Sequence, residues 1–216
     1  MKRRGGVAIA QEGEEGLRHA AQVIRNGGVV ILPTDTTFAV AANALSPEAL
    51  KRVHKLKQRD PTKQMSIMVA SVEDVARYAY VDARCLRFIG GVLPGPLTVV
   101  LPARESRAPI LASGGTIGVR VPSSLFCQNL AKLVDVPLTA TSANRAGMPE
   151  TYTFEDAMSS FAGGTEIPDL VIQGLVGTAR QPSTIIDLTK TPPAILRQGV
   201  LSERELLEAW CRAGEE

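Results

Sequence analysis

The chain has 216 residues, which is enough for one α/β domain of generous size or for two small domains. Hydrophobic residues make up 44% of it and its net charge is only +2, so a disordered chain and a strongly basic tail are excluded, although a local basic patch is not. No run approaches the roughly 18 apolar residues of a membrane helix, and the basic start has no apolar run long enough for a secretion signal. We therefore expect a cytoplasmic protein with no membrane association.

The first third of the chain alternates between helix and strand. Residues 14–28 predict an amphipathic helix that ends at a pair of glycines, and residues 29–33 predict a buried strand because they are apolar throughout. Residues 46–59 predict a second helix, with Ser46 as its N-cap and Pro47 at its first helical position.

The middle of the chain continues this alternation. Helices are expected over residues 71–79, with Ser71 as N-cap, and over 82–93 and 123–134. Strands are expected over residues 65–70, 93–103 (after a proline-rich turn), 116–122 and 136–142.

The last third holds more strands in a row. A short helix at 154–162 precedes strands at 169–174, 183–188 and 194–199, and a helix at 201–212 closes the chain. This order predicts an α/β (α+β) fold with a twisted, mixed parallel and antiparallel sheet flanked by helices. No Gly/Ser/Pro-rich linker divides the sequence, so we expect one domain over residues 1–216.

Several catalytic motifs are absent from the sequence. The three cysteines form no CxxC pair, which indicates reduced thiols, and the two histidines (His19 and His54) lie apart within predicted helices, so no protein metal site is expected. There is no GxSxG, no P-loop, and no GxGxxG after a strand. Nucleophilic catalysis by a triad is therefore not expected.

Three polar clusters lie at strand or helix ends: PTDTT (33–37), KLKQRDPTK (55–63) and TATSAN (139–144). Each alone is compatible with an ordinary polar turn or a solvated helix end. Arg120 is harder to explain this way, because it lies in an apolar strand, where Val119 and Val121 point to the opposite face. The face that carries Arg120 is therefore either exposed to solvent or in contact with an anion. Together the clusters predict a basic, hydroxyl-rich site without a general acid or base, suited to an anionic ligand such as a phosphate.

These segments also carry a family resemblance. The ordered set LPTDTTFAV, KLKQRDPTKQMSIMV, LPGPLTVVLP, TIGVRVP, PLTATSANRAG, STIID and ILRQG resembles the YrdC-like family, the threonylcarbamoyl-AMP synthases. The resemblance runs over about residues 14–210, nearly the whole chain, in its short single-domain form. It implies a YrdC-like fold with a large basic concave surface.

The resemblance also implies an activity. Family members combine L-threonine, bicarbonate or CO2, and ATP with Mg2+ into L-threonylcarbamoyladenylate and pyrophosphate, and a partner threonylcarbamoyl-transferase complex passes the group to tRNA. The threonine nitrogen captures CO2, and the resulting carbamate attacks the α-phosphorus of ATP. Such a reaction needs charge neutralisation and positioning more than a protein nucleophile, which fits the residues present.

Site residues follow by matching the family's motifs. The residues expected to neutralise ATP phosphates and serve catalysis are Lys57 and Arg59 of the KxR pair, and Ser142 and Asn144 of the SxN pair. Further nucleotide contacts are expected from Lys63, Thr116 and Arg197, and threonine contacts from Thr36, Arg120 and Ser183. Phe38 and Ala39 stand where the family usually has Tyr and Gly, and a glycine needed there for a positive φ would leave Ala39 strained.

Two other functions remain open on the sequence alone. One is a YrdC-like paralogue that binds double-stranded RNA or tRNA through the same basic concavity without synthase activity, since lysine and arginine bind phosphates irrespective of sequence. The other is a relative that uses carbamoyl phosphate, as the YrdC-like domain of hydrogenase maturation proteins does. Those domains belong to much longer chains with acylphosphatase and zinc segments that this sequence lacks.

Overall fold

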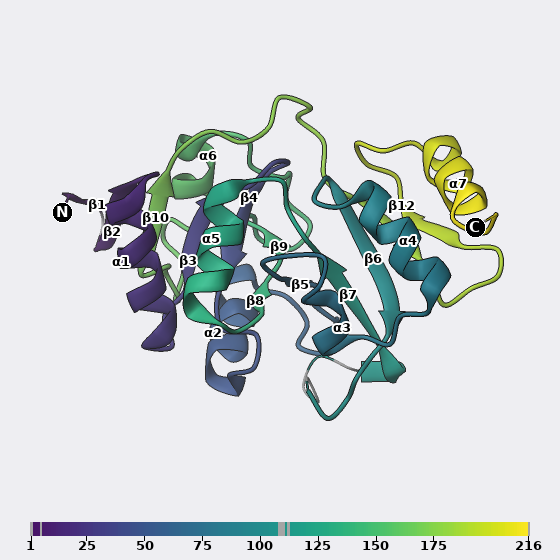
Figure 1. Cartoon of the computed structure of the whole chain (residues 1–216). Helices are drawn as coiled ribbons and strands as arrows, with labels where there is room; N and C mark the ends of the chain where they lie inside the picture. The colour runs from purple at the N-terminus through teal and green to yellow at the C-terminus, as the bar shows by residue number, and fades with distance from the viewer. Residues whose placement is uncertain (1, 5, 108–110, 112, 216) are drawn as a thin grey trace.

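The structure, a computed structural model, describes residues 2–4, 6–107, 111 and 113–215, and they form two six-stranded sheets that lie side by side (Figure 1). The first sheet has the order β1 (Lys2–Arg4), β2 (Val7–Gln11), β10 (Leu170–Gln173), β3 (Val30–Pro33), β4 (Phe38–Ala41) and β9 (Thr141–Ser142). Strand β10 pairs in parallel with β2 and β3, whereas β4 is antiparallel to both of its neighbours.

The second sheet has the order β12 (Ala194–Arg197), β11 (Thr184–Asp187), β6 (Leu97–Pro102), β7 (Thr116–Arg120), β5 (Ile67–Met68) and β8 (Leu138–Thr139). It is also mixed, because β11 with β6 and β5 with β7 are parallel pairs while the others are antiparallel. The predicted fold class, a mixed α/β arrangement flanked by helices, is confirmed.

The two sheets are joined where β8 passes into β9. Residues 136–142 were expected to form one strand, but β8 pairs with β5 in the second sheet and β9 pairs with β4 in the first. Thr139 holds this crossing, because its hydroxyl donates to the carbonyl of Val40 (2.8 Å) and accepts from the backbone N–H of Ala42 (3.1 Å). The prediction of one continuous strand is therefore wrong, since each half satisfies its backbone in a different sheet.

Helices cover the sheets. They are α1 (Glu14–Arg25), α2 (Pro47–Lys57), α3 (Val75–Tyr78), α4 (Ala83–Val92), α5 (Leu125–Val134), α6 (Phe154–Ser159) and α7 (Glu203–Arg212), with one 3-10 turn at Ser113–Gly115. The Ser46 hydroxyl accepts from the backbone N–H of Ala49 at the start of α2, and Ser202 forms a capping box with Glu205 in α7. Helices α4 and α7 lie together over the second sheet (Figure 1).

Two further expectations needed correction. The helix expected over residues 71–79 is the single turn α3, because the Ser71 hydroxyl bonds the Asp74 side chain instead of capping a longer helix. Strand β4 was not anticipated, although its four residues are apolar and fully within the buried core. No helix in the described part of the chain is long and apolar enough to cross a membrane.

Candidate functional site

A cavity of about 220 Å³ lies where the two sheets meet, and both sheets supply its walls. Six of the ten residues expected in the site line it: Thr36, Arg59, Arg120, Ser142, Ser183 and Arg197. The cavity is smaller than the roughly 300–1,000 Å³ typical of pockets that enclose a drug-sized ligand. It can therefore hold a molecule the size of an amino acid, and only part of a larger one.

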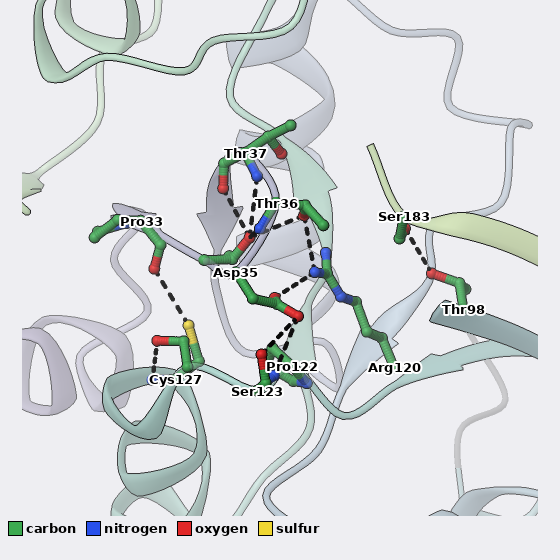
Figure 2. A network of polar contacts seen from close by, with 12 residues as sticks. Pro33, Asp35, Thr36, Thr37, Thr98, Arg120, Pro122, Ser123, Cys127 and Ser183 are labelled. Carbon is green, nitrogen blue, oxygen red and sulfur yellow. Dashed lines mark hydrogen bonds and ion pairs between the residues drawn. The ribbon is translucent and has the colours of Figure 1, made fainter. Parts of the chain in front are cut away.

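Arg120, at the end of β7, contacts an anion that belongs to the protein itself (Figure 2). Its guanidinium donates to the carboxylate of Asp35 and, at 2.8 Å, to the hydroxyl of Thr36. The other oxygen of Asp35 accepts from the backbone N–H and the hydroxyl of Ser123, both at 3.2 Å. The Arg120 Nε atom is buried and has no hydrogen-bond partner among the described residues.

The turn between β3 and β4 is an organised set of hydroxyls. Thr34 is central, because its hydroxyl donates to the carbonyl of Thr37 (2.8 Å) and lies 3.1 Å from the hydroxyl of Thr36. It also accepts the backbone N–H of Thr36 at 3.2 Å. All three threonines are buried, so the turn presents fixed polar groups to the cavity.

The opposite wall comes from β11, β12 and the loop that follows the SxN segment. Arg197 donates to the carbonyl (2.8 Å) and hydroxyl (3.1 Å) of Ser183, whose hydroxyl lies 3.1 Å from that of Thr98. Arg197 also lies 3.6 Å from the carboxylate of Glu150, which accepts a hydrogen bond from Tyr152.

Glu150 corrects the expectation of a site without an acid or base, because this carboxylate lines the cavity. Little in the sequence points to it. Glu150 lies in an irregular loop, six residues after Asn144, and belongs to none of the three polar clusters. Asp35 lies within PTDTT, but no role was expected for it, because an aspartate is common in an ordinary polar turn.

Lys57 lies behind the cavity wall. Its side chain is buried, and its ammonium donates to the backbone carbonyls of Ser142 and Asn144, the latter at 2.7 Å. The carbonyl of Lys57 accepts from the backbone N–H of Ala146 at 2.8 Å. Both the side chain and the backbone of Lys57 therefore hold the SxN turn against the end of α2. Desolvation by burial, with a smaller effect from nearby Arg59, lowers the pKa of Lys57 to about 7, and Glu150 opposes this shift.

The remaining expected residues lie around the cavity rather than on its wall. Asn144 is buried and donates to the carbonyl of Met148 at 2.5 Å, which fixes the SxN turn. Thr116 begins β7, and its carbonyl accepts from Gln64 at 3.4 Å. Lys63 lines a separate depression of about 570 Å³ beside α2, and Arg59 borders both hollows.

The two departures from the family pattern are accommodated. Phe38 is fully buried in the hydrophobic core. Ala39 lines the cavity within β4, paired with Leu32 and Ser142. Among the described residues other than glycine, positive φ values occur only at Gln58, Asp135 and Arg180, so the expected strain at Ala39 is absent.

Comparison with known proteins agrees with this geometry. Residues 22–199 match the Sua5/YciO/YrdC family, which carries the description "Telomere recombination". A Pyrococcus abyssi protein named threonylcarbamoyl-AMP synthase is 36% identical over 197 residues, which cover 88% of this chain and 56% of that protein. This chain thus spans little more than half the length of that relative.

Solved structures give the same result. The crystal structure of Pyrococcus abyssi Sua5 complexed with L-threonine is 32% identical, with a TM-score of 0.85, and the match covers 94% of this chain and 60% of that one. The crystal structure of Escherichia coli YciO is 25% identical, with a TM-score of 0.79, and covers 93% of this chain and 97% of that one. The fold and cavity thus define a YrdC-like α/β protein, and the chain belongs to the Sua5/YciO/YrdC family.

Proposed function

We propose that this chain is an L-threonylcarbamoyladenylate synthase, a nucleotidyltransferase that makes threonylcarbamoyl-AMP and pyrophosphate from L-threonine, bicarbonate or CO2, and ATP. The observation that carries the proposal is one small cavity lined by three arginines and several hydroxyls, at the junction of the two sheets. The relative named threonylcarbamoyl-AMP synthase and the Sua5 structure complexed with L-threonine support it.

Threonine would bind at the Arg120 end of the cavity. Arg120 lines the cavity, and its planar guanidinium suits the amino-acid carboxylate. The hydroxyls of Thr36 and Ser183 are already oriented by neighbouring groups, so little side-chain entropy is lost when they bind the substrate.

ATP would place its phosphates against Arg59, Ser142 and Arg197, which line the same cavity. Lys57 and Asn144 would act by holding the SxN turn, since their polar groups bond its backbone. Because the cavity is small, the rest of the nucleotide would extend outward past Thr116 and Lys63.

The chemistry follows from this placement. The threonine ammonium first gives up a proton to water. The free amine then attacks CO2 and releases a second proton to water, giving a carbamate. A carbamate oxygen then forms a bond to the α-phosphorus of ATP as the bond to the pyrophosphate oxygen breaks. The arginines stabilise the charge that gathers on the departing pyrophosphate, and the buried cavity strengthens their effect.

Mg2+ would arrive on the ATP phosphates. The described residues contain no group of three or more His, Cys, Asp or Glu side chains able to hold a metal. Mg2+ is commonly bound through phosphates and water with few protein ligands. When bound, it would neutralise part of the triphosphate charge.

The product would then be used outside this chain. We propose that it passes to a partner threonylcarbamoyl-transferase complex for tRNA modification in the cytoplasm. We propose that residues 1–216 act in this step as one YrdC-like domain, whose basic concave surface stays a prediction.

The test is pyrophosphate release from ATP, bicarbonate and Mg2+ with each amino acid in turn. Release that requires both threonine and bicarbonate is expected. ATP binding without release for any amino acid would contradict the proposal and favour the paralogue that binds double-stranded RNA or tRNA.

A further inference from the structure

The arginines of the cavity differ in how their charges are balanced. Arg120 is paired with Asp35, and only 9% and 10% of their side chains are exposed. Arg197 lies 3.6 Å from Glu150, but 42% of its side chain is exposed. No carboxylate among the described residues lies within ion-pair distance of Arg59, whose guanidinium donates to the carbonyl of Gln64.

This difference matters because the proposed reaction brings two anions into one small cavity. An amino acid carries a single carboxylate and a positive ammonium group, whereas ATP carries several negative charges on its phosphates. An uncompensated arginine attracts the more highly charged group most strongly. An arginine that is already paired with a carboxylate can still donate hydrogen bonds, but the pair attracts distant anions only weakly. It therefore favours a ligand with no net charge, such as a zwitterion.

We propose that Asp35 is a specificity-determining residue: it neutralises Arg120, so that this end of the cavity binds the carboxylate of a zwitterionic amino acid and leaves phosphate groups to Arg59. The inference rests on the proposed function. Asp35 would act through its contact with Arg120, without touching the substrate itself.

The contacts of Asp35 fit this role. One carboxylate oxygen faces Arg120, and the other accepts from the N–H and hydroxyl of Ser123, so both oxygens are held (Figure 2). Thr36 accepts from the same guanidinium nitrogen that donates to Asp35. Asp35 and Thr36 thus occupy one nitrogen of the guanidinium, while Arg120 still lines the cavity.

Pyrophosphate is the probe, because it carries the phosphate charge without the nucleoside. Threonine binding is measured by calorimetry with and without saturating pyrophosphate. In the unaltered protein, pyrophosphate leaves threonine affinity unchanged. In Asp35→Asn, whose side chain has the same shape without the charge, pyrophosphate binds roughly tenfold more tightly and competes with threonine.

Glu150→Gln is the matched control. It removes one negative charge from the same cavity, beside Arg197 instead of Arg120. Pyrophosphate is expected not to compete with threonine in this variant. Equal competition in both variants would show that total charge decides, and would overturn the assignment to Asp35.

Thermal melting shows whether Asp35→Asn folds. If it does not fold, the measurement on the unaltered protein still tests the inference. Competition between pyrophosphate and threonine in the unaltered protein overturns the inference alone, because synthase activity is compatible with it. Failure to bind threonine at all overturns both the inference and the proposed function. Unchanged pyrophosphate affinity in a folded Asp35→Asn variant also overturns the inference.

Discussion

Arg120 and Lys57 are both buried cations next to the cavity, but they are balanced in different ways. Arg120 has a carboxylate partner, Asp35, from the turn between β3 and β4 of the other sheet. Lys57 has only backbone carbonyls, and burial lowers its pKa to about 7. The first arrangement keeps a charged group in place at the cavity wall. The second uses a cation to hold the backbone of the SxN turn, with a charge that depends on pH.

The largest effect is expected from removing Arg120. Arg120→Ala leaves Asp35 buried without its partner, which costs about 3–5 kcal/mol of unfolding free energy. Threonine affinity should fall about 10- to 100-fold through loss of a charge-assisted hydrogen bond, with a smaller change for ATP. Denaturant unfolding and substrate titrations measure the two effects.

A double variant sharpens this prediction. Arg120→Ala with Asp35→Ala should be more stable than Arg120→Ala alone, because no buried charge is left unpaired. A double variant less stable than the single one would contradict the ion-pair account. A change in ATP affinity alone would contradict the role of Arg120.

The next effect is expected from Lys57→Met, which removes both donors to the SxN turn. The carbonyls of Ser142 and Asn144 lose their partner, which should cost about 1–3 kcal/mol of unfolding free energy and weaken ATP binding. Lys55→Met is the matched control, because it removes the same charge from an exposed position of the same helix. Equal effects on ATP binding in both variants would mean that the loss of one positive charge weakens binding, and not the loss of the contacts that hold the SxN turn.

A pH series separates the two cations further. The pKa of Lys57 is lowered from 10.5 to about 7 in the folded chain, so between these values the unfolded chain binds a proton that the folded one does not. The stability of the unaltered protein relative to Lys57→Met should therefore rise as the pH increases from 7 toward 10.5. Denaturant unfolding at several pH values measures this. A relative stability that falls over the same range would mean that the carbonyls favour the charged ammonium.

The smallest effect is expected at Cys127, a buried group that plays no part in charge balance. Its thiol donates to the carbonyl of Pro33, and burial raises its pKa to about 12, so it is not a thiolate nucleophile. Cys127→Ser should keep the rate of pyrophosphate release within about twofold, since a hydroxyl can make the same hydrogen bond. Complete loss of release in a folded variant would contradict non-nucleophilic catalysis.

The sequence predicted what depends on local signals. Ser46 and Ser202 marked the starts of α2 and α7, and apolar runs marked most strands. The split at Ala140 was missed, because it depends on pairing with strands far away in the chain. For Arg120 the sequence left open a solvent-exposed face or a contact with an anion, but that the anion is Asp35, 85 residues earlier, required the fold.

The site shows the same limit. Six expected residues line the cavity, and it was the family resemblance that singled them out. The direction of the Lys57 side chain was not predictable, since it depends on how the SxN turn returns to the end of α2. Glu150 was missed because an irregular loop carries no periodicity.

The most direct test of the account is to incubate the protein with ATP, Mg2+, L-threonine and isotopically labelled bicarbonate and to analyse the nucleotides by mass spectrometry. The account predicts an adenylate that contains both threonine and the labelled carbon, formed in equal amount with pyrophosphate. Bound ATP and threonine without any labelled adenylate would contradict the synthase.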